Sequence, residues 1–320
     1  MTNIRTDLAM ESAEVYKISN RTDAPGVKMV TEQNGKLKIT RVHIINDDGV
    51  NALGKPIGNY ITIELPSKIH CEQGMFEDTC QAIANELHSI VPVEENDLVL
   101  VAGLGNWNIT PDALGPKVLS KVLVTRRMTE TMPAEIENNV RPVCGITPGV
   151  LGITGIESCE VIRGIVDKVQ PKLVIAVDAL ASRRMERVAT TIQLSDTGIS
   201  PGAGIGNKRN ALNKETIGVP VIGIGVPTVV DAATMANDTI DLVIDKLSEE
   251  AELYRILKVL DHGEKYMLIQ HVLSPTYMGN LIVTPKEVDE IMDDMAELIA
   301  NGINMALHNG ITIKDLNKYA

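Results

Sequence analysis

Aromatic side chains are scarce in this sequence of 320 residues. Phe, Tyr and Trp together make up 2% of the chain, with a single Trp and a single Phe. A chain of this length buries a substantial core, so that core must be built from Val, Ile, Leu, Ala and Met. Aliphatic cores are typical of helices packed on a sheet, and this composition disfavours an aromatic-rich β-sandwich.

Positive charge is also in short supply. The chain carries 30 Lys and Arg against 42 Asp and Glu, which gives a formal net charge of -12 at pH 7. A surface that binds duplex nucleic acid needs clustered Lys and Arg to neutralise phosphates. We therefore expect no direct nucleic-acid partner.

Long apolar runs are missing as well. The first ten residues lack the apolar core of a signal peptide, and no later run is long enough to span a bilayer. The sequence therefore predicts a cytoplasmic protein without a membrane partner.

The cysteines and histidines do not form a metal-site pattern. The four cysteines lack the paired close spacing of a zinc ribbon, and the six histidines show no His-x-x-x-His spacing. In a reducing compartment the cysteines stay thiols. We expect neither an all-protein zinc site nor a disulfide framework.

An apolar run at residues 98–102 marks a central strand. The run is too short for a buried helix, and it is typical of a strand covered on both faces in a parallel sheet. Gly103 and Gly105 permit a sharp turn, and Pro111 favours the first turn of a helix. Asp112 then lies at a βα junction, where open α/β sheets bind their ligands. The alternative is that Asp112 caps the helix.

Two further apolar runs predict parallel strands. Residues 172–180 form one of them and place Asp178 at its carboxyl end. Residues 219–226 form the other, followed by a helix from 229 to about 247 with Thr228 as its N-cap. The strands alternate with helices, as in doubly wound folds.

The N-terminal part is expected to form an irregular arm to about residue 25, then antiparallel or edge strands at 36–44 and 59–65 with a turn at 46–49. Helices are expected at 73–91, after Asp112, at 156–169 and at 285–308. Glycine-rich loops are expected at 149–155 and 190–209. Pro285 suits the first turn of the last helix. The loop at 190–209 is expected to line a cleft or contact a partner. The whole pattern predicts an α/β fold, with a largely parallel sheet flanked by helices and added N-terminal antiparallel strands.

Asp112 and Asp178 are the candidate catalytic pair. If their strands are neighbours, about 5 Å apart in a parallel sheet, both carboxylates converge on one crevice. Two close carboxylates resist ionising together, so one holds a proton while the other activates water, or the pair binds a cation. Two unrelated helix caps are the alternative.

Other catalytic motifs are weak. The Gly103-Leu-Gly105 turn lacks the third glycine of a dinucleotide fingerprint, because position 108 is Asn. The triplet at residues 196–198, Asp-Thr-Gly, matches pepsin-like proteases but occurs once, and those enzymes need two such loops. There is no Gly-x-Ser-x-Gly elbow, which disfavours a serine hydrolase.

Longer motifs resemble those of one known family. They lie at residues 103–116 (GLGNWNITPDALGP), 147–155 (TPGVLGITG), 176–181 (AVDALA), 195–199 (SDTGI), 206–209 (GNKR), 223–231 (GIGVPTVVD) and 283–289 (VTPKEVD). Together they resemble the germination proteases of spore-forming bacteria, from about Arg5 to His308. The chain is shorter than the family pattern around residues 247–265. The resemblance implies a sandwich similar in fold to the hydrogenase maturation endopeptidases.

The resemblance also implies an activity. The members of this family are endopeptidases that act on small acid-soluble spore proteins during germination. They work as homotetramers in the forespore and spore core. By motif, the two aspartates proposed as catalytic in the family fall on Asp112 and Asp178. No cofactor is implied, but equivalent acidic positions in the hydrogenase relatives engage nickel. A metal-assisted processing enzyme and a non-catalytic binding protein are therefore the alternative functions.

A processing site near the N-terminus follows from the same resemblance. The family is made as zymogens that cut themselves after an acidic residue and before a hydrophobic residue followed by Ala. The tripeptide Asp7-Leu8-Ala9 fits this rule. We therefore predict cleavage between Asp7 and Leu8. This makes 1–7 a propeptide and 8–320 a single peptidase domain, with strands at about 25–66, a sheet core at 73–247 and a helical part at 248–320.

Substrates that carry acidic residues beside the cut need a cationic subsite. Guanidinium and ammonium groups make strong, charge-assisted hydrogen bonds with carboxylates. The candidates in this sequence are Lys208 and Arg209 in the glycine-rich loop, and Arg183 and Arg184 after the second apolar strand.

Overall fold

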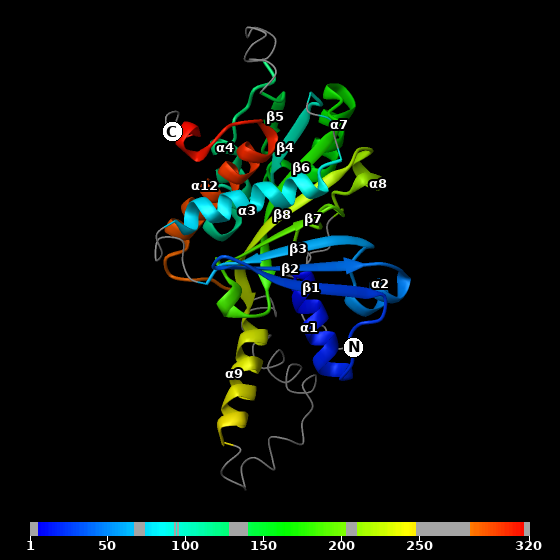
Figure 1. Ribbon diagram of the computed structural model, residues 1–320, viewed down its shortest axis with the longest axis vertical. Helices are drawn as coiled ribbons and strands as arrows, with labels where there is room; N and C mark the ends of the chain where they lie inside the picture. Colours follow the sequence, from blue (N-terminus) through cyan, green and yellow to red (C-terminus); the bar gives the residue numbers. More distant parts are fainter. Residues whose placement is uncertain are drawn as a thin grey trace.

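The structure is a computed structural model that describes residues 6–66, 74–92, 94, 96–127, 140–202, 210–247 and 282–316. Within these residues, nine strands form one sheet in the order β1-β2-β3-β7-β8-β6-β4-β5, with β9 paired to β8 (Figure 1). The strands are β1 Val27–Asn34, β2 Leu37–Ile44, β3 Gly58–Glu64, β4 Val99–Gly103, β5 Val143–Ile146, β6 Leu173–Ser182, β7 Thr191–Ser195, β8 Val221–Asp231 and β9 Ile282–Val283. The helices are α1 Ala9–Asn20, α2 Asp47–Leu53, α3 Met75–Ile90, α4 Leu114–Lys121, α6 Leu151–Thr154, α7 Ser158–Val169, α8 Lys214–Ile217, α9 Ala232–Leu247, α12 Val288–Leu307 and α13 Ile313–Leu316.

The sheet has a parallel core and an antiparallel side. Strands β5, β4, β6 and β8 run parallel, whereas β7, β3, β2 and β1 pair antiparallel, one after the other, beyond β8. Every residue of β4 and β8 is buried, as expected for strands covered on both faces. The predicted fold class is therefore confirmed, and so are the N-terminal antiparallel strands.

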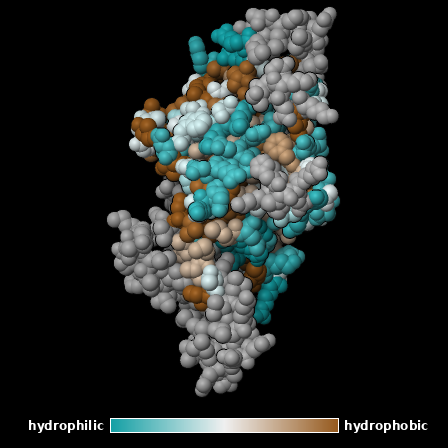
Figure 2. Space-filling model, turned by 90° about the vertical axis from the view of Figure 1, so that its left-hand side faces the viewer, coloured by the Kyte–Doolittle hydropathy of each residue, from teal (hydrophilic) through white to brown (hydrophobic). Residues whose placement is uncertain are grey.

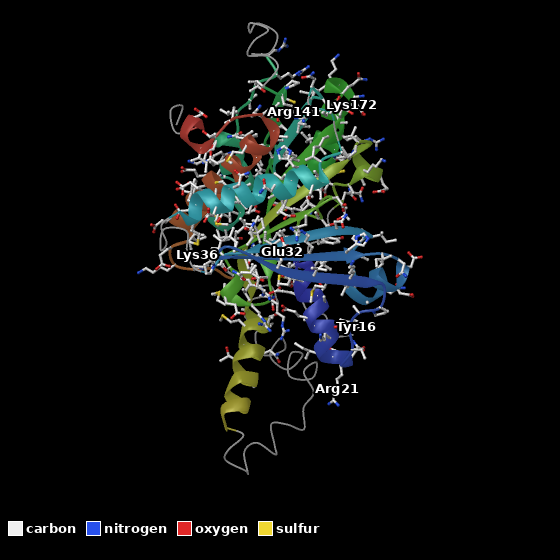
Figure 3. All side chains as sticks on the ribbon, in the orientation of Figure 1. Tyr16, Arg21, Glu32, Lys36, Arg141 and Lys172 are labelled. Atoms are coloured by element: carbon white, nitrogen blue, oxygen red, sulfur yellow. The ribbon has the colours of Figure 1, made fainter. Side chains whose placement is uncertain are left out.

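Helices cover both faces of the sheet. On one face, α3, α4 and α12 pack through side chains such as Leu87, Val118 and Ile299. Residues of α7 and α8 cover the parallel strands on the other face, and α1 packs beside the antiparallel strands (Figure 1). Figure 3 shows Tyr16 of α1 and Arg21, which directly follows this helix, toward one end of the molecule, and Arg141 and Lys172 toward the other.

The surface on one side is mixed in character. Figure 2 shows the left-hand side of Figure 1, with hydrophilic side chains through the middle of the described surface and hydrophobic ones in smaller groups around them. Among the described helices, none is long and apolar enough to cross a membrane.

The expectation of an irregular N-terminal arm is wrong. Residues 9–20 form α1, and Ala9, Met10 and Ala13 are buried against the sheet. This helix has only a weak apolar stripe in sequence, so its stability comes from tertiary packing, which pattern analysis cannot detect. The expected turn at 46–49 is likewise the start of α2, where Asn46 caps the helix by accepting a hydrogen bond from the Gly49 amide at 3.3 Å.

The boundary between β8 and α9 also differs from the prediction. Strand β8 continues to Asp231, and α9 begins at Ala232. The Asp231 carboxylate accepts hydrogen bonds from the amide and the hydroxyl of Thr234, at 2.9 and 3.0 Å, and so fills the capping role. Thr228, the predicted cap, lies inside the strand.

Two loop predictions and the start of one helix need correction. Residues 190–209 contain β7, which the density of glycines had hidden, and 203–209 lie outside the described residues. The loop at 149–155 contains the single turn α6. The last long helix begins at Val288, so Pro285 precedes it and is not in its first turn.

Candidate active site

A cavity of about 270 Å³ opens on the sheet face that α1 and α7 cover, and both candidate aspartates line it. Its walls come from the loop after β4, from the middle of β6 and from β8. The lining residues used below are Asp7, Gly105, Pro111, Asp112, Asp178 and Thr228. The cavity lies beyond the end of the β4–β6 ladder, whereas β6 and β8 continue to pair alongside it as far as Ser182.

Asp178 is placed by the pairing of β4 with β6. These strands are direct parallel neighbours, and their last paired residues are Gly103 and Val177. Asp178 therefore comes immediately after the shared ladder, although β6 itself continues to Ser182, further than predicted. The side chain is 4% exposed, and its Oδ1 accepts a hydrogen bond from the Ala179 amide at 3.0 Å.

Asp112 approaches the cavity from the loop after β4. It ends the short 3-10 helix Thr110–Asp112, whereas the cap position of α4 is Ala113, so Asp112 is not the cap of that helix. The Asp112 carbonyl accepts from the Asn106 amide at 2.9 Å. Thr228 of β8 donates its hydroxyl to the Pro111 carbonyl at 2.7 Å, which ties this loop to the sheet.

Gly105 allows the loop to fold back on itself. Its φ is +110°, a backbone conformation that side chains disfavour, and an added Cβ would lie 2.0 Å from the Asp112 carbonyl oxygen. Replacing Gly105 with Ala must therefore displace Asp112. A misplacement of about 1 Å in a catalytic group costs roughly 10²-fold in rate, and we expect a loss of that order in peptide hydrolysis.

The control for this substitution is Gly152→Ala in α6. An added Cβ at Gly152 would meet nothing within 4 Å, so the rate should stay at the wild-type value. Both rates can be measured by following substrate cleavage on a gel. Wild-type activity in Gly105→Ala would show that the position of Asp112 does not matter.

Asp7, the residue before the predicted processing site, lines the same cavity as the two aspartates. Its amide donates to the Ala181 carbonyl at 2.9 Å, and its Oδ2 accepts from the Ala181 amide at 2.8 Å. Asp7 also lines a neighbouring cavity of about 140 Å³, which contains Lys55 and Gln193. The N-terminal segment is therefore bound to β6 beside the candidate catalytic residues.

Leu8 and Ala9 are buried behind Asp7. Both are fully inaccessible to solvent and belong to an apolar cluster that includes Leu180 of β6. The two residues after the predicted cleavage site are therefore part of the apolar core.

The predicted cationic residues are only partly visible. Lys208 and Arg209 lie outside the described residues. The amides of Arg183 and Arg184 donate to the Glu11 carboxylate of α1, at 2.7 and 3.1 Å, so this part of the chain contacts α1.

Sequence reasoning missed residues that contact the N-terminal segment. Arg187 is buried and pairs with Glu11 at 3.0 Å. Lys55 and Gln193 both donate to the Asp7 carbonyl. For Gln193 the sequence offers one indication, because the alternation of Ile192, Gln193 and Leu194 is typical of a strand. Lys55 follows a turn and gave none.

Asp196, from the Asp-Thr-Gly triplet, is exposed and accepts hydrogen bonds from the Asn59 amide at 2.8 Å and from the Asn59 side chain at 2.6 Å, so it links β7 to β3. Among the described residues, no group of three or more His, Cys, Asp or Glu side chains could hold a metal ion.

Comparison with known proteins gives the family. The germination protease family model matches residues 4–256 and 247–320 of this chain. The germination protease of Clostridium perfringens is 50% identical over 327 residues, which cover 100% of this chain and 99% of that protein. The germination protease of Clostridium tetani is 50% identical over 321 residues, 99% of both chains. That of Bacillus subtilis is 40% identical over 357 residues, 99% of this chain and 96% of that protein. The chain therefore belongs to the germination protease family and is an endopeptidase.

Proposed function

We propose that this endopeptidase begins the degradation of small acid-soluble spore proteins during germination, and that it is made as a zymogen that cuts itself between Asp7 and Leu8. One observation carries the proposal. Asp7, which precedes the predicted cut, lines the same cavity as Asp112 and Asp178 and is bound to β6 through its backbone and its carboxylate.

The proposed chemistry is hydrolysis by an aspartate pair. Asp112 and Asp178 line one cavity. We propose that one of the two carboxyl groups holds a proton while the other is ionised, since two close carboxylates resist ionising together. The ionised aspartate takes a proton from water, and the protonated one gives its proton to the nitrogen of the scissile amide. The alternative is a metal-assisted reaction with nickel or another metal, because two carboxylates can also bind a cation.

The setting of the reaction follows from the family resemblance. We propose a homotetramer that acts in the forespore and spore core, with residues 1–7 as the propeptide. Lys208, Arg209, Arg183 and Arg184 remain the candidates for holding acidic residues of the substrate.

The test is intact mass followed over time, under acidic and dehydrating conditions like those of a maturing spore, with a small acid-soluble spore protein present. We expect the full chain to lose seven residues, to gain Leu8 as its new N-terminus, and then to cut the spore protein. The matched variant Asp7→Ala should process at least about tenfold more slowly, because it loses the hydrogen bond to the Ala181 amide. A first cut at any other bond would refute the processing site.

A further inference from the structure

The carbonyl group of Asp7 has an unusual set of partners. Its oxygen accepts a hydrogen bond from Lys55 Nζ at 2.9 Å and another from Gln193 Nε2 at 3.1 Å. This carbonyl belongs to the peptide bond between Asp7 and Leu8. A cation and an amide N–H at one carbonyl oxygen are the kind of donors that stabilise the negative charge formed during acyl transfer.

Gln193 also contacts the chain beyond that bond. Its Oε1 accepts a hydrogen bond from the Ala9 amide at 2.8 Å. One side chain thus holds the carbonyl before the bond and an amide after it, with Leu8 buried between them. Such a bridge fixes the peptide through backbone groups that every substrate has.

The sheet places Gln193 on the same face as Asp178. Asp178 of β6 is the register partner of Gly225 in β8, and Gly225 is the partner of Gln193 in β7. Partners in adjacent strands direct their side chains to the same face, and two strand spacings amount to about 10 Å. Asp7 lies over this row, because it lines both the cavity that contains Asp178 and the one that contains Gln193.

Lys55 is held in a position suited to a charge interaction. It follows α2 and is partly buried, and it lines the smaller cavity with Asp7. Burial lowers the pKa of the Lys55 ammonium, and the carboxylates of Asp7 and Glu11 oppose that shift. A poorly hydrated ammonium interacts more strongly with a developing negative charge than one in water does.

We propose that Lys55 and Gln193 are catalytic residues that form the carbonyl-binding site of this protease, holding the scissile carbonyl oxygen and stabilising the negative charge it gains. This inference rests on the proposed function, because it takes the bond between Asp7 and Leu8 as the scissile one. It adds electrophilic residues to the aspartate pair.

The step balances with water as the co-reactant. Water attacks the carbonyl carbon of Asp7, the aspartate base takes its proton, and the π electron pair moves to the oxygen between Lys55 and Gln193. The carbonyl then re-forms as the bond to the Leu8 nitrogen breaks, and the aspartic acid gives that nitrogen its proton. The products are the carboxylic acid of Asp7 and the amine of Leu8, and transfer of the acid proton to the amine gives a carboxylate and an ammonium. The aspartate that acted as base now holds a proton and the one that acted as acid is ionised.

The test compares self-cleavage rates of full-length variants by intact mass. Lys55→Met and Gln193→Glu each remove a donor, and Gln193→Glu keeps an acceptor for the Ala9 amide. We expect each to slow self-cleavage about 10²-fold, the usual effect of removing one such donor. Lys55→Arg should recover most of the rate, because it restores a cationic donor. In processed enzyme acting on a small acid-soluble spore protein, kcat should fall while KM changes little.

A control variant and a comparison with the aspartate pair distinguish failure of the carbonyl-binding site from failure of the proposed function. Lys17→Met removes an exposed lysine that pairs with exposed Asp23, and its rate should equal the wild-type rate. If Lys55→Met and Gln193→Glu also keep the wild-type rate while Asp112→Asn is inactive, the carbonyl site is refuted and the aspartate pair stands. If the wild type cuts spore protein but never cuts itself after Asp7, the scissile assignment fails and this inference fails with it.

Discussion

Replacing Asp178 with Asn is expected to lower the rate of peptide hydrolysis by roughly 10³-fold, and Asp112→Asn should do the same, because positioned general acids and bases contribute between about 10² and 10⁴. Asn has the size of Asp but neither accepts a proton from water nor donates one as an acid does. Both substitutions leave the backbone contacts of the cavity in place.

The two losses should not multiply in the double variant. When two residues act together in one step, removing the first already abolishes most of the rate enhancement, so removing the second has little further effect. Intact mass of each pure variant reports self-cleavage, and digestion of a small acid-soluble spore protein reports the reaction on substrate. If either single variant still processes itself at the wild-type rate, the aspartate pair is not the catalytic site.

Asp196→Asn is the matched control for these substitutions. It makes the same chemical change directly after β7, at an exposed side chain that accepts hydrogen bonds from Asn59. We expect wild-type cleavage by this variant. A large loss would instead favour the Asp-Thr-Gly triplet as a functional element.

The sequence predicted the parallel centre of the fold because buried strands leave a strong signal. The runs that became β4, β6 and β8 are almost continuously apolar, and parallel strands covered on both faces require this. Chain order then places Asp112 and Asp178 after the paired part of β4 and β6, so the candidate pair could be found without coordinates.

The contacts around Asp7 could not be found in this way. They join the segment before α1, the turn before β3, and β7, which lie far apart in sequence and meet only when the sheet forms. Residues 9–20 look polar because α1 buries few side chains, and β7 lies in a glycine-dense stretch. Short elements that depend on tertiary packing have no strong local period for a sequence analysis to detect.

Arg187→Met is expected to lower the free energy of unfolding by about 3 kcal/mol, because removing one partner of a buried ion pair leaves the other charge uncompensated. The Arg187 side chain is 6% exposed and pairs with Glu11 at 3.0 Å and with Glu14 at 2.6 Å. Burial opposes its charge, but hydrogen bonds and charge from Glu14 and Glu11 outweigh that effect and raise the pKa of Arg187.

Urea unfolding gives this free energy, and the neighbouring Arg184→Met is the matched control. Arg184 pairs with exposed Glu186 at 3.1 Å, and exposed pairs contribute less than about 1 kcal/mol. Adding Glu11→Gln to Arg187→Met should recover part of the loss, because it removes a buried charge that has lost its main partner. Equal stability of the two Arg variants would show that the buried pair contributes nothing specific.

The same substitution connects stability with processing. Helix α1 begins at Ala9, directly after Leu8, and Glu11 and Glu14 lie in its first two turns. Arg187 therefore holds the helix whose start lies next to the proposed cleavage site. If α1 is anchored in this way, Arg187→Met must slow self-cleavage at temperatures where the protein stays folded, whereas Lys17→Met, which removes an exposed pair with Asp23, must not. If Arg187→Met cuts itself more slowly than the control variant while both are fully folded, then α1 positions the proposed scissile bond as well as stabilising the sheet.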